Sequence, residues 1–352
     1  MINMKKFLIK NHEIYKNGPP FIIAEAGINH NGDVNNVFKM IDVAKNSGVH
    51  AIKFQTFKAK EFITDSSLTY TYKSQGKIIT ESQLELFERC ELSEDDYIRI
   101  KKKCDDENLI FLSTPQNKSD LDFLLQLDIP AIKVGSDDFT NIPLLKSYAS
   151  TNLPLLVSCG MANLEEIKTS LDTIEAYNGY PTVLLLTTSE YPTPPENVNL
   201  QKFSSLSKLF PELPLGYSDH TQSNLTSSLA VSFGASVFEK HFTLDNSLPG
   251  PDHWFSANPV ELGTWSDSIK ISFKMMGNSE IKPTILENQM KSISRRSIVA
   301  LNYIEKGEKF SSINIGLRRP GDGLPPSMFE SLIGKKAKNS IQKNQTLKNS
   351  DF

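Results

Sequence analysis

Eight short apolar runs recur along the chain, and longer segments with helically spaced apolar residues separate them. The runs are FIIAEAG (21–27), AIKFQTF (51–57), LIFLSTP (109–115), AIKVGS (131–136), PLLVSCG (154–160), TVLLLTT (182–188), LPLGYSD (213–219) and ASVFEKHF (235–242). Segments such as 33–48, 163–177 and 224–234 repeat apolar residues every three or four positions, which indicates amphipathic helices. Strands that are apolar on both faces and joined by helices belong to parallel sheets. Eight such units in roughly 250 residues predict an α/β fold, a closed (β/α)₈ barrel of the TIM type.

The pattern changes after Met276. The following stretch is polar and has no repeat, and short runs typical of strands come after it, SIVALNYI and INIGLRRPG. We therefore expect three parts: a barrel domain at 1–280, a linker at 281–295 and a small β-rich domain at 296–352.

Charge gives little reason to expect nucleic acid or membrane as a partner. The whole chain carries a net charge of only −3. Residues 291–352 hold twelve Lys or Arg against five Asp or Glu, which makes this tail +7. Few aromatic residues accompany these charges and no nucleic-acid motif is present, so a solvated basic surface is the simpler interpretation.

Composition is that of a soluble globular protein, with 39% hydrophobic and 22% charged residues. Its three cysteines are odd in number and widely spaced, which favours a reducing compartment over a disulfide framework. The apolar run after the initial MKK is too short for a signal peptide, and no stretch is long enough to span a bilayer. We expect a cytoplasmic protein.

Polar residues end every predicted strand. In (β/α)₈ barrels the carboxyl ends of the strands share one face, and that face carries the active site. The residues at these ends are Glu25, Lys53 with Gln55, Thr114, Lys133 with Ser136, Ser158, Thr188 with Ser189, Ser218 with His220, and His241. Taken alone, Thr114 or Ser158 is equally well explained as a helix cap. Lys53 and Lys133 lie inside apolar runs where an unpaired ammonium is costly to bury, so an anionic ligand is expected beside them.

Two histidines end adjacent strands. His220 and His241 are 21 positions apart, one strand unit, so they are expected at matching heights in the barrel mouth. Two imidazoles form half of a site for a divalent transition metal, with water and substrate in the remaining positions. Glu25 would serve beside them as an acid or base. These residues predict a metal-assisted reaction on a small phosphorylated acid.

Ten motifs occur in a specific order and cover nearly the whole chain. They are AEAGINHNGD (24–33), IKFQTF (52–57), STP (113–115), IKVGS (132–136), SCGMA (158–162), YPTP (191–194), GYSDHT (216–221), EKHFTLD (239–245), PGPDH (249–253) and RRPG (318–321). In this the chain resembles the sialic acid synthase family, whose barrel precedes a domain similar to type III antifreeze proteins, the SAF domain. The resemblance implies condensation of phosphoenolpyruvate with an N-acylated hexosamine, which gives phosphate and a nine-carbon 2-keto acid.

The resemblance also implies a role for each site residue. His220 and His241 would bind the divalent metal, with Mn²⁺ expected before Mg²⁺ or Co²⁺. The phosphoenolpyruvate cradle would consist of Lys53, Thr114, Lys133, Ser136, Ser158 and Ser218. The sugar would meet Gln55, Tyr191 and Asp252, and Glu25 would lie beside the reacting carbons. In the family, the SAF domain of one subunit covers the partner's barrel and supplies an arginine, which the RPG match assigns to Arg319 in a domain-swapped homodimer.

Two positions near the sugar depart from the pattern of some family members, Ser189 where they have asparagine and Asp138 where they have glutamate. The reaction class survives, but three sugars remain open. N-acetylmannosamine would give N-acetylneuraminate, a 2,4-diacetamido-trideoxymannose would give N,N'-diacetyllegionaminate, and a related altrose would give pseudaminate. His253 and Trp254 suggest a more apolar wall, suited to a 6-deoxy sugar, which makes legionaminate a rival of sialate.

Two other functions compete with this interpretation. A Schiff-base aldolase would use Lys53 or Lys133 as its nucleophile. A nucleic-acid-binding protein with a degenerate barrel would use the basic tail, but such a barrel would not need a polar residue at every strand end. The expected partners are therefore the two small substrates and a second subunit, without nucleic acid or membrane.

Overall fold

The computed structural model describes residues 6–352, and the start of the chain with its first lysine, residues 1–5, lies outside the described part. Two compact units make up the chain, Met1–Gly277 and Asn278–Phe352, and each is described by itself. Among the described residues, no helix combines the length and the hydrophobicity needed to cross a bilayer.

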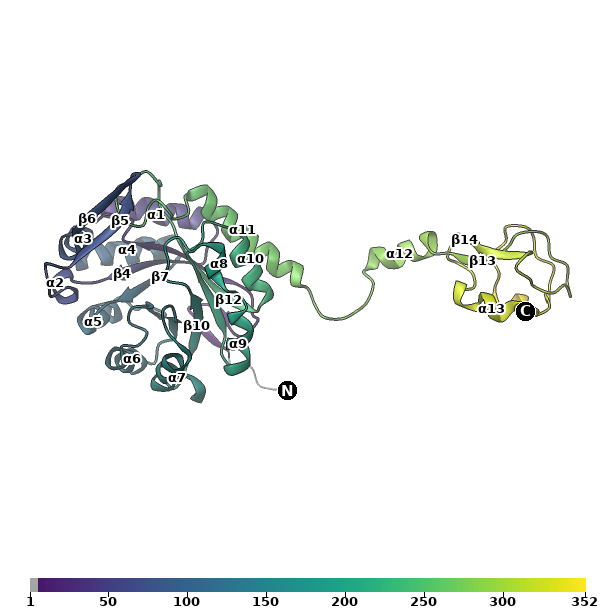
Figure 1. Cartoon of the computed structure of the whole chain (residues 1–352), viewed down its shortest axis with the longest axis horizontal. Coiled ribbons are helices and arrows are strands. Elements are labelled where there is room, and N and C mark those ends of the chain that lie inside the picture. The colour runs from purple at the N-terminus through teal and green to yellow at the C-terminus, as the bar shows by residue number, and fades with distance from the viewer. Residues whose placement is uncertain (1–5) are drawn as a thin grey trace. The chain divides into compact units, whose positions relative to one another are not determined.

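A parallel sheet of eight strands forms the centre of the first unit (Figure 1). Its strands are β3 (Phe21–Gly27), β4 (Ala51–Thr56), β7 (Ile110–Pro115), β8 (Ile132–Val134), β9 (Leu155–Ser158), β10 (Thr182–Thr187), β11 (Leu215–Asp219) and β12 (Ala235–His241). The ladder runs in the order β7-β4-β3-β12-β11-β10-β9-β8, and the two end strands β7 and β8 contact each other, which leaves a nearly closed barrel. The predicted TIM-type fold is confirmed, and each strand falls within one of the eight apolar runs.

Helices follow the strands and surround the barrel (Figure 1). They are α1 (Val34–Asn46), α4 (Glu94–Asp106), α5 (Lys118–Gln126), α6 (Ile142–Ala149), α7 (Leu164–Thr173), α9 (Lys202–Leu209), α10 (Leu225–Ser232) and α11 (Pro259–Met276), with the short α2 (Ala59–Phe62), α8 (Pro195–Val198) and η1 (Ala176–Asn178) in connecting segments. Local sequence sets their starts: Asn258 caps α11 in a capping box with Glu261, ahead of Pro259. Their apolar faces pack on the outer face of the strands in the main core.

The barrel lumen is apolar at one end and polar at the other. Its apolar end holds residues from β3, β4, β7, β9, β10 and β12 and Ala131 just before β8, together with Ile9 and Ile14 from a hairpin of β1 (Phe7–Ile9) and β2 (His12–Ile14). Two positions further along several strands, the buried residue on the same face is polar, because side chains alternate along a strand with a period of two. Ile23 precedes Glu25, Leu156 precedes Ser158, and Val237 precedes Glu239. This alternation creates a packed floor beneath a polar mouth.

A second hairpin, β5 (Thr69–Ser74) and β6 (Lys77–Ser82), follows β4 and leads into α3 (Gln83–Cys90) (Figure 1). The sequence analysis does not anticipate it. Ser74 Oγ accepts a hydrogen bond from the Gly250 N–H at 3.1 Å, and Lys73 Nζ lies 4.5 Å above the centre of the Trp254 ring. The hairpin therefore contacts the loop that contains the PGPDH motif.

The second unit has a small core of its own, formed by buried residues such as Ile298, Phe310 and Leu347. Its elements are α12 (Ile285–Ser294), β13 (Ser297–Ala300), β14 (Ile315–Arg318), α13 (Phe329–Leu332) and the short η2 (Pro326–Met328) and η3 (Asn349–Asp351). β13 and β14 pair antiparallel, and isolated bridges connect several of the loops. Helix α12 lies within the segment 281–295 that the sequence analysis treats as a linker.

Candidate active site

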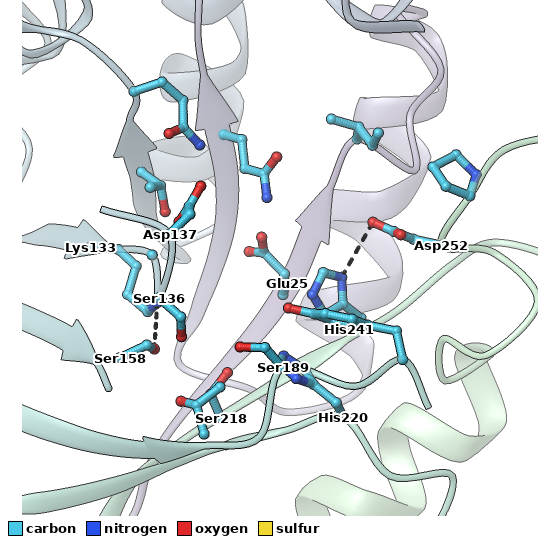
Figure 2. Close-up of a pocket in the computed structure, with 18 of the residues that line it drawn as sticks. Glu25, Lys133, Ser136, Asp137, Ser158, Ser189, Ser218, His220, His241 and Asp252 are labelled. Carbon is cyan, nitrogen blue, oxygen red and sulfur yellow. Dashed lines mark hydrogen bonds and ion pairs between the residues drawn. The ribbon is translucent and has the colours of Figure 1, made fainter. Parts of the chain in front are cut away.

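A cavity of about 530 Å³ opens at the polar mouth of the barrel. Every predicted site residue except Asp138 and Arg319 lines it. These residues are Glu25, Lys53, Gln55, Thr114, Lys133, Ser136, Ser158, Ser189, Tyr191, Ser218, His220, His241 and Asp252. Figure 2 shows its labelled side chains entering from opposite walls, with Glu25 near the centre. The volume suits two small substrates bound side by side.

Two buried lysines and two buried glutamates form a connected cluster on the cavity floor. Lys53 Nζ lies 2.9 Å from Glu25 Oε2 and 3.7 Å from Glu239 Oε2. Lys133 Nζ lies 3.7 Å from the other oxygen of Glu239 and donates to Ser158 Oγ at 2.8 Å. Neither ammonium group is therefore unpaired: Lys53 meets a carboxylate from the adjacent strand β3, and Lys133 meets one from β12, which is not adjacent to β8 in the sheet.

The surroundings shift the pKa values of the two glutamates in this cluster in opposite directions. Burial raises the pKa of Glu25 to about 7, against the opposing effect of Lys53. Burial also disfavours the charge of Glu239, but Lys133 and Lys53 outweigh it and lower the pKa of this carboxyl to about 2. Burial lowers the pKa of Lys133. Glu239 is thus a permanent anion between the lysines, while Glu25 can exchange a proton near neutral pH.

Hydroxyl groups line the wall next to Lys133. Ser218 Oγ donates to Glu239 Oε1 at 3.0 Å, and Ser136 Oγ accepts from the Gly160 N–H at 3.1 Å. A methyl group on Gly160 would lie 2.6 Å from Ser136 Oγ and 2.4 Å from Ser189 Oγ. Only glycine therefore leaves both hydroxyls free to face a ligand.

The two histidines lie next to each other at the ends of the adjacent strands β11 and β12, with ring centres 5.5 Å apart. His220 Nδ1 lies 2.7 Å from the Thr188 carbonyl oxygen, so Nδ1 carries the proton and Nε2 keeps its lone pair. His241 Nδ1 is buried without a hydrogen-bond partner, and Asp252 Oδ2 lies 4.0 Å away from it (Figure 2). Burial lowers the pKa of His220 to about 4 and that of His241 well below its usual value.

These imidazoles fit a divalent metal ion. Both are neutral at physiological pH, which is the form that binds metal, and a bound ion would satisfy the orphaned nitrogen. Within the described part of the chain, no group of three or more His, Cys, Asp or Glu is arranged to hold a metal. Two imidazoles alone would leave coordination positions for water and substrate, as an open catalytic site requires.

Aromatic side chains form the outer part of the cavity. The Tyr191 ring lies 4.1 Å from the His220 ring and 5.5 Å from Phe255, measured between centroids. Tyr70 of β5 and Phe87 of α3 also line the cavity. The hairpin that the sequence analysis misses thus supplies part of this wall.

Of the two remaining predicted residues, Asp138 does not line the cavity, and Arg319 belongs to the second unit. Asp138 accepts a hydrogen bond from the Asn141 side chain at 2.9 Å, at the start of α6, and its neighbour Asp137 lines the cavity instead. Arg319 follows β14 in the second unit, exposed, whereas the Arg318 guanidinium donates to Asn344 Oδ1 at 3.0 Å.

Glu239 is the main residue that sequence reasoning misses. The signal was available in EKHFTLD, because alternation along β12 points residues 239 and 241 to the same face. Asp219 and Lys240 point to the other face, and the sequence alone does not give them a partner there.

Comparison with known proteins assigns the family. Residues 40–281 match the NeuB family, and residues 295–352 match the SAF domain. The chain belongs to the NeuB family. It is a phosphoenolpyruvate-dependent nonulosonic acid synthase, and the fold and the family of the sequence analysis are confirmed.

Individual relatives cover nearly all of this NeuB-family chain. N,N'-diacetyllegionaminic acid synthase of Legionella pneumophila is 38% identical over 93% of each chain, and the protein of that name from Campylobacter jejuni is 39% identical over 93% of this chain and 98% of its own. A crystal structure of N-acetylneuraminic acid synthetase from Leptospira borgpetersenii superposes with a TM-score of 0.73 at 31% identity, covering 81% of this chain and 95% of that one.

Proposed function

We propose that this NeuB-family synthase condenses phosphoenolpyruvate with a 2,4-diacetamido-trideoxymannose to form N,N'-diacetyllegionaminate and phosphate. The observation that carries the reaction is a single cavity in which two buried lysines and several hydroxyls adjoin a pair of neutral imidazoles. Two relatives named for this product support the choice of sugar, as does the aromatic wall around Tyr191. N-acetylmannosamine is the second candidate acceptor and the altrose of pseudaminate the third.

In this proposal the lysine wall holds phosphoenolpyruvate. Lys53 and Lys133 would meet its carboxylate and phosphate, with hydroxyls from Thr114, Ser136, Ser158 and Ser218 completing the cradle. Ligand oxygens would take over the contacts that Lys53 now makes with Glu25 and Thr114. Glu25, released from Lys53, would then act as a carboxylate beside the reacting carbons.

The chemistry follows from where the charges lie. C3 of the enol attacks the sugar aldehyde carbon, a new C–C bond forms, and the aldehyde oxygen takes up a proton. Positive charge develops at C2, where the anionic Glu25 and Glu239 would stabilise it. Water adds to C2 and loses a proton, for which Glu25 is the nearby base. The tetrahedral intermediate then breaks its C–O bond, and phosphate leaves with the bridging oxygen.

His220 and His241 would hold the divalent ion, for which we propose Mn²⁺. When bound, such an ion polarises a carbonyl oxygen without needing a proton. Gln55, Tyr191 and Asp252 would orient the sugar so that its aldehyde lies next to the histidines. Their positions in one wall of the cavity support these roles.

We further propose a cytoplasmic homodimer in which Arg319 of one subunit completes the sugar pocket of its partner. The free cysteines are compatible with a reducing compartment. Arg318 is already bound within its own unit by Asn344, whereas Arg319 is exposed, which favours Arg319 as the residue that reaches a partner.

Phosphate release tests this function directly. The enzyme would receive phosphoenolpyruvate with each of the three candidate sugars, in Mn²⁺ and in chelator. The proposal expects release that requires metal and that is fastest, by kcat/KM, with the diacetamido-trideoxymannose. Faster turnover of N-acetylmannosamine would assign the enzyme to sialate synthesis and overturn the choice of sugar.

The Schiff-base alternative has one observation in its favour, the lowered pKa of Lys133. Lys133 Nζ, however, already contacts Ser158 Oγ and the Val134 carbonyl oxygen, and it is crowded by Glu239. Borohydride reduction in the presence of both substrates decides between them: a covalent adduct on a lysine supports the aldolase, and unmodified protein supports the metal route.

A further inference from the structure

A buried ion pair lies behind the two histidines, on the outer face of the strands that carry them. Asp219 on β11 and Lys240 on β12 are opposite each other in the parallel ladder, and Lys240 Nζ lies 3.2 Å from Asp219 Oδ2. Both side chains are buried, and neither lines the active-site cavity. They therefore cannot touch substrate.

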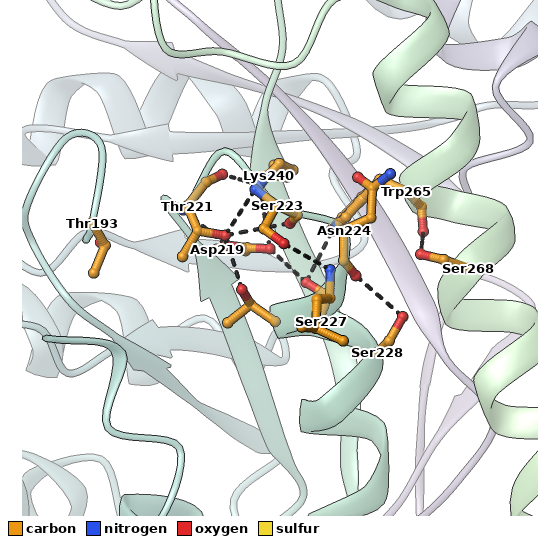
Figure 3. Close-up of polar contacts among 12 residues, drawn as sticks. Thr193, Asp219, Thr221, Ser223, Asn224, Ser227, Ser228, Lys240, Trp265 and Ser268 are labelled. Atoms are coloured by element: carbon orange, nitrogen blue, oxygen red, sulfur yellow. Dashed lines mark hydrogen bonds and ion pairs between the residues drawn. The ribbon is translucent and has the colours of Figure 1, made fainter. Parts of the chain in front are cut away.

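The Asp219 carboxylate accepts hydrogen bonds from three further groups (Figure 3). Its Oδ1 accepts from the Thr221 N–H at 2.9 Å and from the Thr221 hydroxyl at 2.7 Å. Its Oδ2 accepts from Ser227 Oγ at 2.7 Å, and the Ser227 oxygen in turn accepts from Trp265 Nε1 at 2.9 Å. The network thus joins β11, the loop after it, α10 and α11.

His220 lies between the two residues that this network holds. Asp219 precedes it and Thr221 follows it, and Lys240 Nζ also donates to the Thr221 carbonyl oxygen. His241 directly follows Lys240 on the neighbouring strand. One ion pair therefore fixes the backbone on both sides of His220 and the residue before His241.

An ion pair in this position is hard to explain by stability alone. Removing two charges from water is costly, and apolar residues of similar volume are often as stable or more stable. A fully satisfied polar network does, however, specify one geometry. Partners behind metal ligands commonly set the ligand orientation and the metal affinity.

We propose that Asp219 and Lys240 are positioning residues that hold the His220 and His241 imidazoles at the separation a divalent ion requires. This inference rests on the proposed two-histidine metal site. It assigns a function to the charged strand ends that face away from the cavity.

The test measures Mn²⁺ binding by electron paramagnetic resonance in the absence of substrates, together with Tm. The double variant Asp219→Asn/Lys240→Met removes both charges with little change in volume, so it should keep a Tm near that of the wild type. Its Kd for Mn²⁺ should rise by about tenfold or more. Phosphoenolpyruvate binding without metal should change far less, by a factor of about two, because Asp219 and Lys240 make no contact with Lys53 or Lys133 and meet the cradle only through the backbone of Ser218 and Glu239.

Leu262→Ala is the matched control for stability. Leu262 is fully buried on α11, so its truncation should lower Tm without changing Mn²⁺ affinity. If the double variant does not fold, Ser227→Ala removes one hydroxyl of the network and should still weaken Mn²⁺ binding severalfold. Wild-type Mn²⁺ affinity in a folded double variant, or in Ser227→Ala when that is the variant that folds, would overturn the inference.

The same assay separates this inference from the proposed function. If His220→Ala or His241→Ala binds Mn²⁺ as tightly as the wild type, the metal site itself is wrong and the inference falls with it. If both histidine variants lose binding and the double variant keeps it, the metal site stands and the positioning role is wrong.

Discussion

Lys53 Nζ lies 2.9 Å from Glu25 Oε2, and both side chains are buried beneath the active-site cavity. Before substrate binds, the Glu25 carboxylate thus pairs with the Lys53 ammonium group that we propose binds phosphoenolpyruvate. Substrate binding would exchange one anion for another and would free Glu25 for proton transfer.

Lys53→Met should weaken the binding of phosphoenolpyruvate far more than the binding of the sugar. Losing a charge-assisted contact of about 1.5–3 kcal/mol predicts a roughly 10- to 100-fold rise in the phosphoenolpyruvate KM, with the sugar KM changed by less than about threefold. The unliganded variant should also lose about 3 kcal/mol of stability, because Glu25 loses its partner. Lys60→Met, on an exposed lysine, is the control. Equal weakening of the binding of both substrates would show that Lys53 is not part of the phosphoenolpyruvate cradle.

Gly160→Ala should damage the same cradle through a methyl group alone. The added carbon would lie 2.4 Å from Ser189 Oγ and 2.6 Å from Ser136 Oγ, so these hydroxyls must move. We expect a phosphoenolpyruvate KM at least about tenfold higher and a loss of about 1–3 kcal/mol in stability. Gly263→Ala on α11 meets no atom within 4 Å and should be neutral or stabilising. Normal kinetics for Gly160→Ala would mean that ligands do not use this space.

His50 should make the fold sensitive to acid. Its Nδ1 accepts the Ile22 N–H at 2.9 Å, and burial lowers its pKa to about 4. Between about pH 6.5 and 4 the unfolded chain binds a proton that the folded chain does not, so stability falls as pH falls through this range. His50→Asn keeps an acceptor and removes the titration. Urea unfolding should show that the free energy of unfolding falls less in the variant than in the wild type between pH 7 and 4.5, by on the order of 1 kcal/mol. An unchanged pH profile would contradict the assignment.

Arg319 should act on a partner's barrel. Mixing the inactive variants His241→Ala and Arg319→Ala under conditions of subunit exchange should restore activity, since one pocket of a mixed dimer contains neither defect. Arg318→Ala is the matched control and should remain active by itself, because Arg318 is bound within its own unit. Exchange without recovery would place Arg319 in its own subunit's site or outside any site.

The barrel was predictable because its signal is physical and repeated. Eight buried strands need eight apolar runs, and the polar ends of those runs identified eleven of the residues that line the cavity. The β5–β6 hairpin was missed because its residues are mostly exposed and polar, so no apolar run marks it.

The parts of the site that sequence reasoning did not predict have local causes. Asp137 and Asp138 are adjacent in a loop, where no periodicity tells which carboxylate faces the cavity. The position of Glu239 in the cavity could have been predicted from strand alternation alone. The pairing of Lys53 with Glu25 was not, because the register between β3 and β4 that brings them together is a property of the folded sheet.

The ¹⁸O content of the released phosphate tests the central claim most directly. Turnover of phosphoenolpyruvate and the sugar in H₂¹⁸O, followed by mass spectrometry of the phosphate, reports which bond breaks. If water adds to C2 and phosphate leaves with the bridging oxygen, the released phosphate contains no ¹⁸O. One ¹⁸O atom per phosphate would show that water attacks phosphorus, which would contradict the proposed condensation at this site.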